Sequence, residues 1–283
     1  MKMNKNIHTF IGCGHDYEES RIVLFGAPFD STTSFRPGTR FASAAMRNES
    51  MGIETYSPYL DADLEDRCIF DGGDLELIFG NAAKSLSIIE DFAAQVLQDK
   101  KIPCMIGGEH LVTLGAVRAA VEAYPELHIL HFDAHADLRD DYLGEKLSHA
   151  TVMRRCYDLV GDHKIYQFGI RSGERSEFLW AKDHVFTSKF NFGGLEAAVA
   201  ALAGKPVYLT IDLDVLDPSV FPGTGTPEAG GVSFNELMAA VSAVSGLNIV
   251  AADINELSPI YDQSGASTAL ACKLLREVLL QLG

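Results

Sequence analysis

Ile129-Leu-His-Phe-Asp133-Ala-His135-Ala-Asp137 is the stretch that decides the fold of this 283-residue chain. Its first half is an apolar run typical of a buried strand, and in an extended backbone residues 133, 135 and 137 point to the same side. Two carboxylates and an imidazole therefore leave the end of a predicted core strand side by side. Because buried anions are costly unless a cation neutralises them, the pattern favours a metal site. A capped strand end whose charges face solvent is the alternative.

A second stretch, Tyr208-Leu-Thr-Ile-Asp212-Leu-Asp214, repeats this arrangement of an apolar run followed by carboxylates at positions i and i+2. A further candidate follows the apolar run 102–106, in Gly107-Gly108-Glu109-His110. The candidate metal ligands are four aspartates and two histidines: His110, Asp133, His135, Asp137, Asp212 and Asp214. Two divalent cations would balance the four negative charges, and a carboxylate-rich set favours Mn²⁺ over Zn²⁺. We therefore expect two Mn²⁺ ions per chain.

Strands and helices alternate around these stretches. Apolar runs predict strands at 21–27, 102–106, 127–133, 164–170, 206–212 and 248–254, with at most a short strand at 68–70. Periodic segments predict helices at 41–51, 81–100, from Gly108 to about 123, and at 150–159, 194–202, 233–244 and 267–280. Strands that are apolar throughout indicate a mostly parallel α/β sheet with helices on both faces, which binds ligands at the carboxyl ends of its strands. We expect a single domain over residues 1–283.

Composition limits the possible function classes. A formal net charge of −16 argues against a nucleic-acid partner and would attract small cationic substrates. No apolar run approaches the roughly 20 residues that a membrane span needs, and Met1 to Phe10 lacks the apolar segment of an export signal. The five cysteines are scattered and form no C-x-x-C pair, which predicts reduced thiols. We expect a cytoplasmic protein without a membrane partner.

Three ordered motifs resemble the signatures of the ureohydrolases, the arginase and agmatinase family: Ile106 to His110, Asp133 to Asp137, and Thr210 to Pro218. The similarity runs from about Phe10 to Leu280 and is closest to the agmatinases. It implies a three-layer α/β/α sandwich on a mostly parallel eight-stranded sheet, the arginase/deacetylase-like fold. It also implies one metal held by His110, Asp133, Asp137 and Asp212, and a second held by Asp133, His135, Asp212 and Asp214.

Guanidine hydrolysis needs a nucleophile, a countercharge for the guanidinium and a proton for the leaving amine. A water shared between two metals would become the hydroxide nucleophile. Glu256 resembles the family glutamate that pairs with the guanidinium, and His149, in Ser148-His-Ala-Thr151, resembles a histidine that shuttles protons. We predict Glu256, His149 and Asp137 as the catalytic residues. Ala150 stands where relatives usually carry glycine.

The remaining histidines match no motif, and we expect them to be surface or structural residues: His8, His15, His128, His131, His163 and His184. Taken without the resemblance, a single glutamate after a strand is usually a solvated loop residue. An isolated histidine such as His149 is also more often a surface or structural residue than a catalytic one.

The loop at 138–148 bears on the substrate. Its carboxylates outnumber its cations: Asp140, Asp141 and Glu145 against Arg139 and Lys146. Such a rim should repel a carboxylate and accept the ammonium of agmatine, with Asp140 as the predicted substrate-binding residue, although a solvated acidic loop is the alternative. The expected reaction is hydrolysis of agmatine to putrescine and urea, a step of polyamine biosynthesis.

Several rival functions stay open. Guanidinobutyrase and arginase activities would use the same metals, and a deacetylase-like enzyme with one zinc would share the fold. A non-catalytic metal-binding regulator or scaffold belongs to a different class, and it would be free to lose Glu256, His149 or one ligand. All of these residues are present in the sequence. From the resemblance we also expect a homo-oligomer, a trimer or hexamer.

Overall fold

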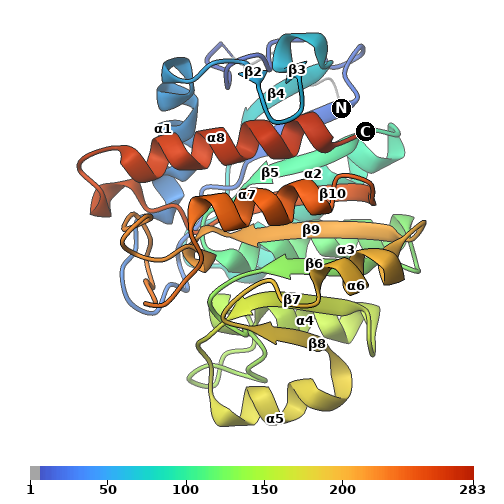
Figure 1. The fold of residues 1–283 in the computed structure, drawn as a ribbon, viewed down its shortest axis with the longest axis vertical. Helices are drawn as coiled ribbons and strands as arrows, with labels where there is room; N and C mark the ends of the chain where they lie inside the picture. The colour runs from blue at the N-terminus through green and yellow to red at the C-terminus, as the bar shows by residue number, and fades with distance from the viewer. Residues whose placement is uncertain (1–6) are drawn as a thin grey trace.

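The computed structural model describes residues 7–283 and contains an eight-stranded sheet in the order β4-β1-β5-β10-β9-β6-β7-β8 (Figure 1). Every neighbouring pair in this sheet is parallel. The strands are β1 (Ile22–Gly26), β4 (Ile69–Asp74), β5 (Ile102–Ile106), β6 (His128–Phe132), β7 (Ile165–Ile170), β8 (Phe186–Lys189), β9 (Pro206–Asp212) and β10 (Asn248–Asn255). A separate antiparallel pair joins β2 (Tyr56–Ser57) to β3 (Ala62–Asp63).

Helices cover both faces of the sheet, so the expected three-layer α/β/α sandwich is confirmed (Figure 1). One apolar core contains residues of α1 (Ala42–Glu49), α6 (Leu195–Leu202), α7 (Phe234–Ala243) and α8 (Ala266–Gln281). The other contains residues of α2 (Ala82–Gln98), α3 (Thr113–Ala123), α4 (Val152–Val160) and α5 (Arg175–His184).

Successive strand residues alternate between these two cores. Leu24 and Leu130 belong to the first core, whereas their neighbours Phe25 and Ile129 belong to the second. Both faces of each central strand are therefore buried, which explains why the strands are apolar at consecutive positions.

One strand of the main sheet and one helix were not predicted. Strand β8 is Phe-Thr-Ser-Lys, a short polar edge strand whose residues are half-buried or exposed. Helix α5 precedes it and begins at a capping box formed by Glu174 and Glu177. The predicted strand at 68–70 is longer in the structure, as β4 (Ile69–Asp74), and after Gly108 the chain forms a 3-10 turn at His110–Val112 before α3 begins.

Gly107 and Gly108 follow β5 at a point where two other segments pass close by. A Cβ atom on Gly108 would lie 2.0 Å from the carbonyl oxygen of Phe29, and one on Gly107 would lie 1.7 Å from Asn255 Oδ1. The absence of side chains allows the loop after β1 and the end of β10 to pack here. This packing holds His110 at the centre of the carboxyl edge of the sheet.

The cysteines and the lengths of the helices bear on the expected thiol state and on membrane contact. All five cysteines are free thiols, as expected. Within residues 7–283 no helix combines the length and the apolar character needed to cross a membrane. Residues 1–6 of the stretch searched for an export signal lie outside the described residues, so that expectation stays a prediction.

Candidate metal centre and cavity

The six predicted metal ligands meet at the carboxyl edge of the sheet. They lie at or just after the ends of β5, β6 and β9, and β10 lies between β5 and β9 in the sheet. Five of them are buried, whereas the His135 side chain keeps 24% of its surface exposed. Strands far apart in the sequence thus supply a compact group of carboxylates and imidazoles, as expected for a parallel sheet.

Three carboxylates surround one nitrogen of His110. Its Nδ1 atom lies 3.0 Å from Asp133 Oδ2, 3.2 Å from Asp137 Oδ2 and 3.4 Å from Asp212 Oδ2. Donor atoms that share an ion at about 2.1 Å lie roughly 3 Å apart. His110 Nδ1 is also buried without a hydrogen-bond partner. An orphaned buried nitrogen among three carboxylate oxygens fits a bound cation.

A second group of donors lies around His135. Its Nδ1 atom is 3.0 Å from Asp214 Oδ2 and 3.6 Å from Asp133 Oδ1. Asp133 therefore presents one oxygen to the His110 group and the other to the His135 group. The described residues form two sets with metal-binding spacing, one of His110, His131 and Asp133 and one of Asp133, His135 and Asp214.

The electrostatics of this cluster also favour a cation. Burial and the neighbouring Asp133 raise the pKa of Asp137 to about 7. Burial, followed by the charges of Asp214 and Asp133, raises the pKa of Asp212 well above its usual range. Divalent cations would remove this mutual repulsion between carboxylates, because they neutralise buried negative charge.

The hydrogen-bond partners of His110 determine which nitrogen faces the cluster. His110 Nε2 lies 2.9 Å from Thr210 Oγ1, and Thr210 also hydrogen-bonds to the carboxylate of Asp253. An ionised carboxylate only accepts, so the Thr210 hydroxyl donates to Asp253 and accepts from His110 Nε2–H. In the neutral imidazole Nδ1 is then the unprotonated nitrogen, which is the form that binds a metal.

Glu256 lies immediately behind this cluster. It follows β10, is buried, and its Oε1 atom accepts a hydrogen bond of 2.7 Å from the backbone N–H of His110. Burial and then the nearby Glu109 raise its pKa well above the usual range. Both Glu256 (φ 66°) and Asp137 (φ 52°) adopt the left-handed region that disfavours non-glycine residues. Such strained backbone is frequent at functional sites.

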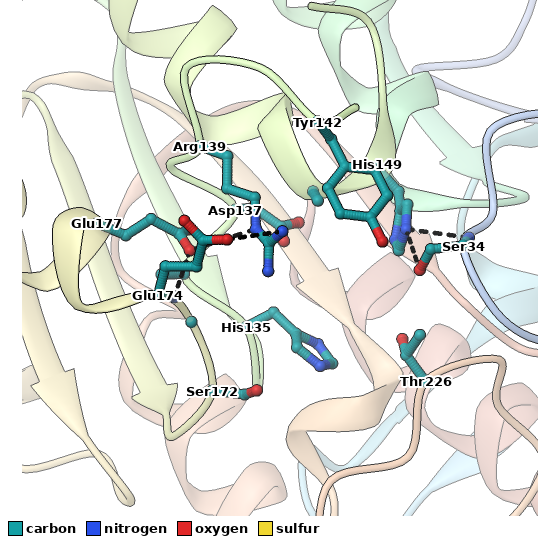
Figure 2. Close-up of a pocket in the computed structure, with 13 residues that line it drawn as sticks. Ser34, His135, Asp137, Arg139, Tyr142, His149, Ser172, Glu174, Glu177 and Thr226 are labelled. Atoms are coloured by element: carbon teal, nitrogen blue, oxygen red, sulfur yellow. Dashed lines mark hydrogen bonds and ion pairs between the residues drawn. The ribbon is translucent and has the colours of Figure 1, made fainter. Parts of the chain in front are cut away.

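A cavity of about 260 Å³ opens in front of His135 and Asp137 (Figure 2). His149 lines it, and its Nε2 atom lies 2.9 Å from Ser34 Oγ and 3.3 Å from the backbone nitrogen of Ser34. A backbone N–H can only donate, so His149 Nε2 accepts and Nδ1 carries the proton. Burial and then the nearby His135 lower the pKa of His149 to about 4.

Ala150, the departure from the family pattern, is compatible with this backbone. It belongs to the 3-10 turn His149–Thr151, which Ser148 and Thr151 close with a capping box. Ala150 is not among the described residues with positive φ, so the turn needs no glycine at this position.

The predicted substrate-binding residue Asp140 does not lie in the cavity. Its carboxylate is exposed and pairs with Arg155 Nη2 at 2.9 Å. The carboxylates that line the cavity beyond the metal cluster are Glu174 and Glu177. Figure 2 shows both beside Arg139, whose guanidinium lies 3.2 Å from Glu174 Oε1 and 3.5 Å from Glu177 Oε2. The carboxylates of this rim thus come from residues 174 and 177, outside the loop at 138–148.

Sequence reasoning also passed over His131, which was expected to be structural or exposed. His131 is fully buried and its Nε2 atom lies 2.7 Å from Asp133 Oδ2. It stands two residues before Asp133, so the alternation of strand side chains could have placed it on the same face as the aspartate. The spacing of Glu174 and Glu177 as a capping box after a strand was a comparable signal.

Comparisons with known proteins extend over nearly the whole chain. The sequence model of the arginase family matches residues 20–281. An agmatinase from Bacillus subtilis (strain 168) is 48% identical over 276 residues, which cover 96% of this chain and 95% of that protein. The structure of a candidate agmatinase from Clostridium difficile is 52% identical, with a TM-score of 0.92 over 94% of this chain and 98% of the other. The agmatine ureohydrolase of Thermoplasma volcanium is 34% identical, with a TM-score of 0.89 over 98% and 94% of the two chains.

Proposed function

This chain belongs to the arginase family, and we propose that it hydrolyses agmatine to putrescine and urea with two Mn²⁺ ions bound. Family membership makes it a hydrolase of linear amidine C–N bonds. The observation that carries the proposal is His110 Nδ1, orphaned among three carboxylates and next to a cavity of about 260 Å³. The relatives named agmatinase support the choice of substrate.

We assign the metals to the six ligands named above. His110, Asp133, Asp137 and Asp212 would hold one ion, and Asp133, His135, Asp212 and Asp214 the other. When bound, a pair of divalent ions would lower the pKa of water and so supply a hydroxide nucleophile near neutral pH. Mn²⁺ is the preferred ion because carboxylates outnumber imidazoles in the ligand set.

Three residues of the chain would act on the substrate. Glu256 would supply the negative charge that pairs with the guanidinium, a partner that would offset the cost of its burial. His149 lines the cavity and, as a neutral imidazole, would take up the proton that the attacking water releases and pass it to the nitrogen of the breaking C–N bond, which leaves as the putrescine amine. Asp137 would act as a ligand that also lines the cavity. The oxygen of water is added to the guanidine carbon as the C–N bond to the diamine breaks, and this carbon leaves as part of urea.

The rim of the cavity favours a substrate with a cationic tail. Glu174 and Glu177 face a single cation there, Arg139, so the three side chains together carry a net negative charge. An ammonium group is attracted to such a rim and a carboxylate is repelled. The Arg139 guanidinium could nevertheless pair with the carboxylate of a guanidino acid, which makes 4-guanidinobutyrate the main rival substrate.

A urea assay on the Mn²⁺-loaded enzyme tests the proposal, with agmatine, arginine and 4-guanidinobutyrate compared side by side. We expect agmatine to have the highest kcat/KM. A higher value for arginine or 4-guanidinobutyrate would overturn the substrate assignment and leave the metal assignment intact. Release of no urea from any of them, with both metals bound, would favour a non-catalytic metal-binding regulator or scaffold.

The proposal also covers the domain organisation, the location, the assembly and the partner of the chain. We propose one ureohydrolase domain over residues 1–283, located in the cytoplasm and assembled as a homo-oligomer, a trimer or hexamer. Its partner would be a small cationic guanidine compound rather than a nucleic acid, because the chain carries a formal net charge of −16.

A further inference from the structure

Three polar side chains form a row across neighbouring strands next to the candidate metal centre. His131 of β6 is directly paired in register with Gln167 of β7, and Gln167 is paired with Thr187 of β8. His131 and Gln167 are both fully buried, and Thr187 is half-buried at the edge of the sheet. We call His131, Gln167 and Thr187 the polar row.

The orientation of the Gln167 amide follows from its partners. Gln167 Nε2 lies 2.7 Å from the carbonyl oxygen of Ala136, which can only accept a hydrogen bond. The nitrogen of the amide must therefore face Ala136, and Oε1 accepts from Thr187 Oγ1 at 3.2 Å. Gln167 is consequently fixed from two sides, by the edge strand and by the backbone of the metal-binding segment.

The protonation of His131 follows in turn from Gln167. Gln167 Nε2 also lies 3.1 Å from His131 Nδ1, so this nitrogen accepts the hydrogen bond. A neutral imidazole that accepts at Nδ1 carries its proton on Nε2. His131 Nε2 lies 2.7 Å from Asp133 Oδ2, and it therefore donates to that carboxylate.

We propose that His131 is a positioning residue, which holds the Asp133 carboxylate through Nε2–H and is itself set in this tautomer by Gln167 and Thr187. Asp133 is the carboxylate that faces both groups of donors, so its orientation decides whether two ions can share it. The inference rests on the metal site of the proposed function. Hydrogen bonds from outer residues orient metal ligands and change metal affinity.

The same distances would allow a rival assignment in which His131 binds the metal through Nε2, because His131, His110 and Asp133 have metal-binding spacing. The Gln167 amide distinguishes the two assignments. A ligating imidazole needs an acceptor at its other nitrogen, as His110 has in Thr210, whereas His131 meets a donor. The row thus gives His131 and His110 opposite roles toward Asp133.

Substitutions in the full-length enzyme test this proposal, with Mn²⁺ affinity measured from free Mn²⁺ by EPR and melting temperature measured in parallel. His131→Phe removes the donor, and we expect Mn²⁺ affinity to fall roughly 10- to 100-fold. His131→Gln keeps an N–H near the Asp133 carboxylate and should restore most of this loss. His128→Phe is the matched control, because His128 is buried at the opposite end of the same strand.

Gln167→Glu tests the tautomer, because a glutamate would accept from Nδ1–H of the neutral His131 and leave Nε2 without the proton that faces Asp133. The proposal predicts Mn²⁺ binding weaker than in Gln167→Met, which loses the same hydrogen bond to the Ala136 carbonyl without introducing an acceptor. Tighter binding would instead identify His131 as a ligand. Unchanged affinity in His131→Phe, or no recovery in His131→Gln, would also overturn the proposal. If His131→Phe does not fold, Gln167→Glu decides alone. Agmatine hydrolysis by the wild-type enzyme reports on the proposed function separately.

Discussion

Asp133 is the residue on which the candidate metal centre depends. Its Oδ2 atom accepts a hydrogen bond from His131 and faces His110. Its Oδ1 atom accepts a hydrogen bond of 2.6 Å from the backbone N–H of His135. A carboxylate held from several sides keeps its orientation without a large loss of side-chain entropy on metal binding. The single residue thereby connects the two groups of donors.

Asp214→Asn tests the second group of donors. Asp214 Oδ2 lies 3.0 Å from His135 Nδ1, and an amide in its place removes one negative charge from the cluster. We expect the variant to lose at least one Mn²⁺ equivalent per chain by elemental analysis after Mn²⁺ loading. Asp141→Asn, at an exposed carboxylate of the neighbouring loop, is the control. Two equivalents retained in Asp214→Asn would refute the ligand assignment.

His149→Asn tests the proton transfer. Loss of a positioned acid–base group lowers kcat by roughly 100- to 10,000-fold, and we expect this fall with Mn²⁺ content unchanged. Ser34→Ala keeps the imidazole and removes only the hydroxyl 2.9 Å from it, so its kcat should fall less. A kcat for His149→Asn close to that of the wild type would exclude His149 from the reaction.

At the residue level, sequence identified groups whose chemistry repeats along one strand and missed groups that depend on other strands. Asp133, His135 and Asp137 follow one strand at alternate positions, which was a sequence signal even though β6 ends at Phe132 and the backbone of Asp137 leaves the extended region. His131 acquires its role from Gln167, and Glu174 from Arg139. Asp140, the predicted substrate-binding residue, is exposed and pairs with Arg155 of helix α4, and it is not among the residues that line the cavity.

Among the structural elements, the junction after β5 tolerates the least change. Gly108→Ala places a Cβ atom 2.0 Å from the carbonyl oxygen of Phe29, so a strand end or the loop after β1 must shift. We expect the free energy of unfolding in urea to fall by about 1–3 kcal/mol. Gly246→Ala is the control, because a Cβ atom there meets no atom within 4 Å. Equal stabilities of the two variants would contradict this account.

Asp262 stabilises the N-terminus of α8. Its two oxygens accept from the backbone N–H groups of Ser264 (3.0 Å) and Ser267 (2.7 Å) and from both hydroxyls. Burial alone would raise its pKa, but these hydrogen bonds lower it to about 2. Asp262→Asn cannot accept on both sides, and we expect it to lose about 1–2 kcal/mol of unfolding free energy at pH 7.

The same pKa predicts how this loss depends on pH. A carboxylate with a pKa of about 2 in the folded state and about 3.9 in the unfolded state stabilises the fold above pH 4. This contribution disappears as the pH falls through 2. The stability difference between wild type and Asp262→Asn should therefore narrow between pH 4 and pH 3 in urea unfolding. A constant difference would contradict the assignment, and Asp183→Asn, at an exposed site, is the control.

Elements with long apolar runs were predictable, and short or polar ones were not. Strands β5, β6, β7, β9 and β10 lie within a residue or two of their predicted bounds because both of their faces are buried. Strand β8 needs only one neighbour and keeps exposed residues, so it lacks that signature. Yet β8 supplies Thr187 to the polar row, which shows that an edge strand without a sequence signal can still support the site.

At the scale of the whole molecule, the strand order explains how distant motifs meet. The motifs after β5, β9 and β6 are separated by long stretches of sequence, but these strands lie in the central run β5-β10-β9-β6 of the sheet. Motif order and strand character sufficed to predict the layers and the edge that carries the site. The order of strands came only from the structure, because hydrogen bonding between distant segments leaves no local pattern.

The central claim is that this edge of the sheet holds two metal ions that share Asp133. Anomalous diffraction at the manganese edge, from crystals of the Mn²⁺-loaded enzyme, measures this directly. We predict two peaks, one beside His110 and Asp137 and the other beside His135 and Asp214, both in contact with Asp133. A single peak, or no peak between these side chains, would contradict the account.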